Sequence, residues 1–348
     1  MLAITEAAEL LQRATERPGR LALLRALGFQ SPAGALDRAA ATRLGLDDDT
    51  RRAEVAAGPG TLRVLVLEVK PGATLRESAG RAARRVAGRA PELLWLVLAF
   101  KRGGEMVLAI PAPGGSPGVA ALLVNPAGVH PSDAESLVAL SGASGDGDLD
   151  THLRWREALG RDTLTRRFYR DLEQAVRALG AGARGVATED VRQSLALRCV
   201  SRLLFLAFLE AKGWLDGDRA FLSRQVAARG GDLHRTLLEP LFFGTLNAPM
   251  ARRAAAARAF GRLPFLNGGL FTRDSLEKRH RALRFADHDI AHVVGNLLAR
   301  YRVTAHEESA EFSEAAVDPE MLGRAFESLM ASDYRRITGA FYTPSAMI

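Results

Sequence analysis

Cysteine and lysine are scarce in this sequence, and each shortage limits the chemistry available. Cys199 is the only cysteine among 348 residues, so an internal disulfide and a thiolate zinc cluster are both excluded. It lies in the apolar run LALRCVSRLLFLAF, which favours a small buried hydrophobe over a nucleophile. Only four of the 47 basic residues are lysines. With so much alanine, glycine and arginine, a GC-rich coding sequence accounts for the arginine excess, which is therefore weak evidence for DNA binding.

Long apolar runs are also missing. No uninterrupted run reaches membrane-spanning length, and the first 20 residues carry acids early without the apolar core of a signal peptide. We therefore expect a cytoplasmic protein with no membrane partner. The chain is 47% hydrophobic and 25% charged, as in an ordinary globular protein, and it is long enough for two domains. Its formal charge of +7 permits contact with a polyanion.

Residues 1–140 are expected to form an α/β domain. The first 60 residues have helical patterns, whereas residues 62–69 are nearly continuously apolar, as in a strand buried on both faces. A polar, arginine-faced helix over 73–90 comes next and is followed by another apolar strand. The order strand, helix, strand predicts a parallel crossover. The expected strands are 62–69, 93–100, 106–110 and 119–124.

Helices are expected to dominate the rest of the chain. The segment 141–150 (SGASGDGDLD) has glycines and acids without apolar periodicity, which predicts a linker. A helical domain is expected over 151–316, and its strongest helix, at 190–212, is apolar around its whole circumference in the middle. A further domain is expected to begin at 317–348, where Thr343-Pro344 is typical of a helix start.

Five sequence words in the second half carry a resemblance. They are RLLFLAFLEAKGWL (202–215), LFFGTLNAP (241–249), LPFLNGGLF (263–271), VDPEMLGRAFESLM (317–330) and TGAFYTP (338–344). Together and in this order they resemble the region that precedes the catalytic domain in large DNA adenine methyltransferases of single-chain restriction–modification enzymes (type IIG or IIL). The phage-exclusion methyltransferases of BREX and DISARM systems are similar. The resemblance covers roughly residues 150–348.

The resemblance implies a cofactor, a partner and a site. Phe341, Tyr342, Thr343 and Pro344 match the segment that forms one wall of the S-adenosylmethionine pocket, at the start of a Rossmann-like methyltransferase domain. A capped helix start offers free backbone N–H groups to the carboxylate of the methyl donor. Double-stranded DNA is the implied substrate, and other restriction or defence subunits are possible partners. Family members continue with a glycine-rich turn and an Asn/Asp-Pro-Pro-Tyr/Phe motif, neither of which occurs in this sequence. We therefore expect a catalytically incomplete N-terminal portion of such an enzyme.

The first domain suggests a second chemistry. Glu68-Val69-Lys70 ends a buried strand that precedes a helix and another strand, the setting of the Glu-x-Lys half of a PD-(D/E)xK nuclease. Two carboxylates would bind Mg²⁺ there and the lysine would orient or deprotonate water. Asp49 and Glu54 are the candidates for the second carboxylate. A degenerate nuclease fold and a solvated strand end stay open as alternatives, because Glu-x-Lys is common by chance.

Two further interpretations stay open. The chain could be a non-catalytic helical interaction module of a defence complex. The pair His288 and His292, one helical turn apart beside acids, could suggest a metal site, but no third ligand is evident from the spacing. A solvated helix start at Asp287 is the simpler interpretation.

Overall fold

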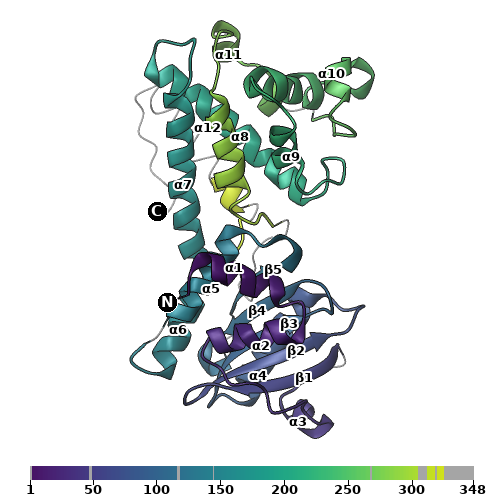
Figure 1. The fold of residues 1–348 in the computed structure, drawn as a ribbon, viewed down its shortest axis with the longest axis vertical. Helices are drawn as coiled ribbons and strands as arrows, with labels where there is room; N and C mark the ends of the chain where they lie inside the picture. The colour runs from purple at the N-terminus through teal and green to yellow at the C-terminus, as the bar shows by residue number, and fades with distance from the viewer. Residues whose placement is uncertain are drawn as a thin grey trace. The chain divides into compact units, whose positions relative to one another are not determined.

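The chain forms two compact units (Figure 1). The computed structural model describes residues 2–46, 49–115, 118–143, 145–266, 269–304, 312–317 and 320–324. Unit 1 runs from the N-terminus to Arg166 and also includes the short strand β6 (Phe312–Glu314). Unit 2 begins at Arg167 and contains the helices that follow. The mixed α/β character expected for the first half is confirmed, and the second half is mostly helical.

Unit 1 is built on a six-stranded mixed sheet in the order β1-β2-β3-β4-β5-β6. Strands β2 and β3 are parallel, as are β5 and β6, and the other neighbours are antiparallel. Each of the four strands expected from the sequence is present, within one residue of its expected ends. The first five strands are β1 (Thr50–Ala57), β2 (Leu62–Val69), β3 (Leu94–Phe100), β4 (Met106–Pro111) and β5 (Val119–Val124).

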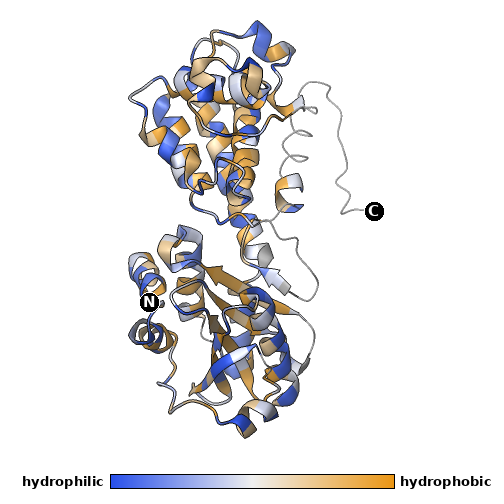
Figure 2. Ribbon diagram, turned by 90° about the vertical axis from the view of Figure 1, so that its right-hand side faces the viewer, coloured by the Kyte–Doolittle hydropathy of each residue, from blue (hydrophilic) through white to orange (hydrophobic). Residues whose placement is uncertain are grey.

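Helices cover both faces of this sheet. Successive side chains of a strand point to opposite faces, so the apolar strands supply two separate cores. One core contains Val64, Leu98 and Leu122 together with residues of α1, α2, α5 and α6. The other contains Leu65 and Val97 together with residues of α4. Figure 2 shows hydrophobic residues along the strands. The unit 1 helices are α1 (Ile4–Arg13), α2 (Arg17–Ala26), α3 (Arg38–Arg43), α4 (Leu75–Arg89), α5 (Pro131–Gly142) and α6 (Asp148–Ala158).

The predicted parallel crossover is confirmed. Strand β2 leads into α4, and β3 returns parallel to β2 with Leu62 opposite Leu94 and Glu68 opposite Phe100. The helix buries its small residues, among them Ala79 and Ala83, against the sheet. Small side chains let the helix lie close to the strands. The arginines of the helix lie outside this buried face. The crossover also leaves Glu68 and Lys70 at the carboxyl end of β2.

Residues 50–57 form a strand, which corrects the expectation of helix throughout the first 60 residues. Strand β1 pairs antiparallel with β2 from Thr50 opposite Val69 to Ala57 opposite Arg63. The tight turn between the two strands contains Gly60 at a positive φ of 51°. Alanine-rich segments favour helix by local propensity, but pairing with the otherwise open edge of β2 decides the outcome here.

The expected linker at 141–150 is helical at both of its ends. Helix α5 ends at Gly142 and α6 already begins at Asp148, and both belong to unit 1. The Asp148 carboxylate accepts hydrogen bonds from the backbone N–H (2.7 Å) and the hydroxyl (2.8 Å) of Thr61, which lowers the pKa of Asp148. Trp155 of α6 is buried in the core of the sheet. The division between the units therefore falls at Arg166, later than expected.

Unit 2 is organised around the long helix α8 (Glu189–Ala211), which confirms the helix expected at 190–212. Gly213 has a φ of 74° and donates its N–H to Glu210, while Trp214 donates to Leu209, so the helix ends in a Schellman motif. The other unit 2 elements include π-type helices. The π-type helices described are η3 (His234–Leu238), η4 (Pro240–Leu246) and η7 (Val293–Leu298). Helix α7 (Arg161–Ala181) begins in unit 1 and continues into unit 2. The other α-helices described in unit 2 are α9 (Phe221–Ala227), α10 (Ala255–Arg258), α11 (Ser275–Arg279) and α12 (Asp287–His292).

The expected final domain at 317–348 lies almost entirely outside the described residues. Residues 320–324 are helical, and Met321 and Leu322 are buried, in agreement with the apolar stripe in the sequence. The expected Rossmann-like start and the motif Phe341–Pro344 lie beyond the part of the chain that the structure describes. Within that part, no helix has both the length and the apolar character needed to cross a membrane.

Replacement of Trp155 tests the assignment of α6 to unit 1. Trp155 is 4% exposed and its ring centroid lies 5.7 Å from that of Phe29. Trp155→Ala is expected to lower the free energy of unfolding by about 3–5 kcal/mol, because a large buried side chain is lost. Leu153→Ala in the same helix, where the side chain is exposed, is expected to change it by less than about 0.5 kcal/mol. Urea denaturation followed by circular dichroism measures both. Equal effects would show that α6 does not pack on the sheet.

Candidate functional site

The three residues of the expected nuclease site do not come together on one face of the sheet. Glu68 lies on the same face as Val66, and Glu54 is opposite Val66 in the register of β1 and β2, so the two glutamates share a face. Asp49 precedes β1, and its carboxylate contacts Arg81 and lies 3.5 Å from the Ser78 hydroxyl. Both of these residues belong to α4, on the opposite face of the sheet.

Lys70 stays at the carboxyl end of β2. Its backbone N–H donates to the carbonyl of Asp49 at 2.8 Å, and the residue is exposed. The structure therefore places Glu68 and Glu54 on one face of the sheet and leaves Asp49 apart. The expectation of residues 1–60 as helices and loops hid this placement, because only the register of β1 places Glu54 beside Glu68.

Both glutamates on this face are already engaged by arginines. The Glu54 carboxylate accepts a hydrogen bond from Arg52 at 2.9 Å and lies 3.5 Å from a guanidinium nitrogen of Arg17. The Glu68 carboxylate lies 3.2 Å from a guanidinium nitrogen of Arg51. Arg51 lies at an irregularity in the register of β1, between Thr50 and Arg52. The side chains of Glu54 and Glu68 are only 10% and 15% exposed, so the pairs are partly shielded from solvent.

These side chains border an open cavity of about 660 Å³, which we call the unit 1 cavity. Helix α2 and the segment before it form one wall, and strands β1, β2 and β3 with the turn after β3 form the other. Such a volume is within the range of small-molecule sites, roughly 300–1,000 Å³. The charged residues that line it are Glu16, Arg17, Arg20, Arg52, Glu54, Glu68 and Arg102.

Arg20 is the cation of the unit 1 cavity that contacts both backbone carbonyls and an aromatic ring. One guanidinium nitrogen donates to the carbonyls of Ala14 (3.1 Å) and Thr15 (2.8 Å), and the guanidinium carbon lies 3.8 Å from the centroid of the Phe100 ring. Burial lowers the pKa of Arg20, while the nearby carboxylates of Glu68 and Glu54 raise it. Arg20 remains charged, because a guanidinium does not lose its proton in proteins.

A second polar site lies inside unit 2, and we call it the Arg202 cluster: Arg202, His234, Glu239, Arg273 and Glu277. Arg202 is 5% exposed and projects from the apolar middle of α8. It binds Glu277 with two guanidinium nitrogens, one at 2.9 Å, and donates to the carbonyl of Leu270 at 2.6 Å. A bidentate pair of this kind is among the strong interactions of protein interiors.

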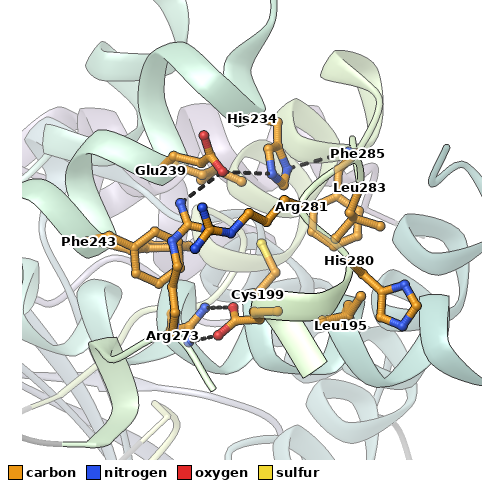
Figure 3. Close-up of a pocket in the computed structure, with 14 residues that line it drawn as sticks. Leu195, Cys199, His234, Glu239, Phe243, Arg273, His280, Arg281, Leu283 and Phe285 are labelled. Atoms are coloured by element: carbon orange, nitrogen blue, oxygen red, sulfur yellow. Dashed lines mark hydrogen bonds and ion pairs between the residues drawn. The ribbon is translucent and has the colours of Figure 1, made fainter. Parts of the chain in front are cut away.

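The other half of the Arg202 cluster surrounds Glu239. Arg273 donates to the Glu239 carboxylate at 2.9 Å and stacks over Phe243, with 3.9 Å between the guanidinium carbon and the ring centroid. His234 and Glu239 point toward one another in Figure 3, with 4.0 Å between Nε2 and the carboxylate. The N–H of Phe285 donates to Nδ1 of His234, so the imidazole proton lies on Nε2, toward Glu239.

The cavity at the Arg202 cluster is too small for a cofactor. Its volume is about 40 Å³. A water molecule needs roughly 10–15 Å³ by the same measure, so the space suits water and excludes S-adenosylmethionine. Cys199 borders this cavity, and burial raises the pKa of its thiol to about 12, which confirms it as a buried, unreactive side chain.

Three of the words that carry the resemblance meet at the Arg202 cluster. Arg202 begins the first word, Phe242 and Phe243 belong to the second, and Leu270 and Phe271 end the third. The Arg202 guanidinium lies within 5.5 Å of both ring centroids of the second word. The Phe271 ring lies 6.0 Å from that of Phe205 and 5.9 Å from that of Phe242. The three words therefore form one packed core around a buried ion pair.

Asp287, next to the histidine pair of α12, has a structural role. The Asp287 carboxylate accepts backbone N–H groups of Asp232 and Leu233, at 2.8 and 2.7 Å, at the start of the helical segment that contains His234. His288 is largely exposed and pairs with its neighbour Asp289. Within the described ranges, no three His, Cys, Asp or Glu side chains converge as a metal site.

No protein-family model, no curated protein and no solved structure matches the chain.

Replacement of Arg202 tests the importance of the buried pair. Arg202→Met is expected to lower the free energy of unfolding by about 3–5 kcal/mol, because Glu277 remains buried without its partner. Arg279→Met, at an exposed position of α11, is the matched control and is expected to have an effect below about 0.5 kcal/mol. Chemical denaturation measures both. An effect of Arg202→Met as small as that of the control would contradict the burial of the pair.

The stability of unit 2 is expected to decrease as the pH is lowered, because of His234. Burial lowers the pKa of His234 to about 4 from 6.5, although Glu239 opposes the shift. The unfolded chain therefore binds one more proton than the folded chain between these values. Stability is complete above about pH 6.5 and falls by about 3 kcal/mol as the pH drops toward 4.

Substitution of His234 checks this pH dependence. His234→Gln is expected to reduce the slope of unfolding free energy against pH in this window by about 1.4 kcal/mol per pH unit. His288→Gln, at an exposed position, should leave the slope unchanged. Urea denaturation at a series of pH values from 4 to 7.5 provides the slopes. An unaltered slope in His234→Gln would mean that the imidazole is accessible to protons in the folded protein.

Proposed function

We propose that this chain is the N-terminal portion of an S-adenosylmethionine-dependent DNA adenine methyltransferase of a restriction–modification or phage-defence system. The observation that carries the proposal is the ordered set of five words between residues 202 and 344, which ends on Phe-Tyr-Thr-Pro. The packing of three of these words around Arg202 supports it, because a shared core gives a physical reason for their joint occurrence.

Each part of the chain has a distinct role in this proposal. Unit 2 is a helical spacer, since the cavity inside it is too small for the cofactor. Phe341, Tyr342, Thr343 and Pro344 supply one wall of the S-adenosylmethionine pocket. Methyl transfer goes to the exocyclic amine of an adenine rotated out of the DNA duplex. The groups that grip this adenine would belong to a downstream Asn/Asp-Pro-Pro-Tyr/Phe motif of the parent protein.

A Mg²⁺-dependent nuclease activity of unit 1 is the second candidate. One observation favours it: Glu54 and Glu68 come from neighbouring strands onto one face, with Lys70 two residues after Glu68. Metal binding there would have to displace Arg17, Arg51 and Arg52 from the two carboxylates. Because these arginines would have to be displaced, the nuclease proposal has less support than the methyltransferase proposal.

Methyl transfer by the parent protein tests the proposal. The reading frame is expressed with its downstream codons, and transfer of labelled methyl groups from S-adenosylmethionine to unmethylated plasmid DNA is measured. We expect N6-methyladenine from the extended protein and none from residues 1–348 alone. Tyr342→Ala in the extended protein should weaken cofactor binding roughly tenfold, the effect of losing one aromatic contact, whereas Tyr334→Ala should not.

Two outcomes would contradict the proposal. One is a downstream frame without a glycine-rich donor loop and an Asn-Pro-Pro-Tyr-like motif. The other is an extended protein that binds DNA or a partner protein but transfers no methyl group to adenine. The second outcome would favour an interaction module in a defence complex.

A further inference from the structure

The unit 1 cavity combines a charged rim with an apolar floor. Its apolar lining residues include Leu21 and Leu24 of α2, Val66 of β2 and Phe100 of β3. Four arginines and three glutamates line the rim, and Arg51 adds a further positive charge on Glu68 from outside the lining. A site of this composition suits a ligand that has an anionic group at one end and an apolar or flat body at the other.

The glutamates orient the arginines of the rim. Glu54 holds Arg17 with one carboxylate oxygen and Arg52 with the other. The side chains of these arginines remain 57% and 51% exposed, so about half of each side chain is open to a further partner. A guanidinium has five N–H donors, and a single carboxylate engages only part of them.

Two further arginines have donors to spare. Arg20 is held by two backbone carbonyls through one nitrogen, and its remaining nitrogens have no hydrogen bond among the described residues. Arg102, in the turn after β3, makes no hydrogen bond or ion pair with any residue that the structure describes. The backbone therefore holds Arg20 in place, and Arg102 has its donors available to a ligand. Both residues line the unit 1 cavity.

We propose that the unit 1 cavity binds a phosphomonoester carried on a nucleoside, either a free nucleotide or the 5′-phosphorylated end of a nucleic acid. A phosphomonoester carries a charge between −1 and −2 at neutral pH, and arginines bind it with paired, charge-assisted hydrogen bonds. A monoanionic carboxylate would use fewer of the four guanidinium groups. The base stacks on the Arg20 guanidinium or packs on the leucines, since both surfaces are flat or apolar.

This assignment is independent of the methyltransferase proposal, and it needs no metal. The two glutamates serve as counter-ions that keep the arginines in place. A nuclease site would instead use the same carboxylates as Mg²⁺ ligands. The requirement for a divalent cation therefore distinguishes the two uses of the cavity.

Ligand binding to the full chain tests the proposal. Isothermal titration at low salt in EDTA compares 2′-deoxyadenosine 5′-monophosphate, 2′-deoxyadenosine and inorganic phosphate. We expect the monophosphate to bind at least roughly tenfold more tightly than the nucleoside, because the nucleoside lacks the charge-assisted contacts. Competition by a 5′-phosphorylated oligonucleotide, but not by its 5′-hydroxyl counterpart, assigns the ligand to a nucleic-acid end. Competition by neither oligonucleotide assigns it to a free nucleotide.

Two arginine variants provide the matched comparison. Arg102→Gln is expected to weaken binding of the monophosphate roughly tenfold, the loss of one charge-assisted contact. Arg43→Gln removes an exposed arginine of α3 outside the cavity and should leave affinity unchanged. Both positions are exposed, so neither variant should disturb folding. Equal affinity for nucleotide and nucleoside, equal effects of the two variants, or binding that appears only with Mg²⁺ would each overturn the proposal.

Discussion

Burial of the sheet on both faces is the constraint on which unit 1 depends. Leu65 and Val97 belong to the core under α4, whereas Val64 and Leu98 belong to the core under α1, α2, α5 and α6. A shift of one residue in register would exchange the two sets, so the strand pairing is strongly specified. Helix α2 must also lie over the strand ends where polar residues emerge. The unit 1 cavity forms there because charged side chains cannot join the apolar core.

The buried charge of Arg202 has a comparable role in unit 2. Arg202 projects from an otherwise apolar stretch of α8 and takes two kinds of partner, the Glu277 carboxylate and the carbonyl of Leu270. An unpaired guanidinium in this environment would be costly, so the segments that carry the partners must stay close to the helix. Three of the five sequence words that carry the resemblance thus lie around Arg202.

The two proposals rest on separate residues and on separate physical arguments. Methyl transfer is proposed from the order of sequence words in the second half of the chain. Phosphate binding is proposed from charges around the unit 1 cavity, where Glu54 and Glu68 are neutralised by arginines. The same two carboxylates would serve a nuclease only without those arginines. Arginines bound to Glu54 and Glu68 therefore favour anion recognition at this face, whereas a metal ion bound to them would favour nuclease chemistry.

Local patterns in the sequence determined much of the fold. The apolar runs at 62–69 and 93–100, the helix between them and the helix at 190–212 follow from side-chain periodicity, which acts over a few residues. Tertiary structure alone decided that residues 50–57 form a strand and that β6 joins β5, because both depend on an open sheet edge. It also decided that Glu54, not Asp49, lies beside Glu68, since the face of a strand is set by its register. The pairing of Arg202 with Glu277 joins distant segments, and no local pattern specifies such a partner.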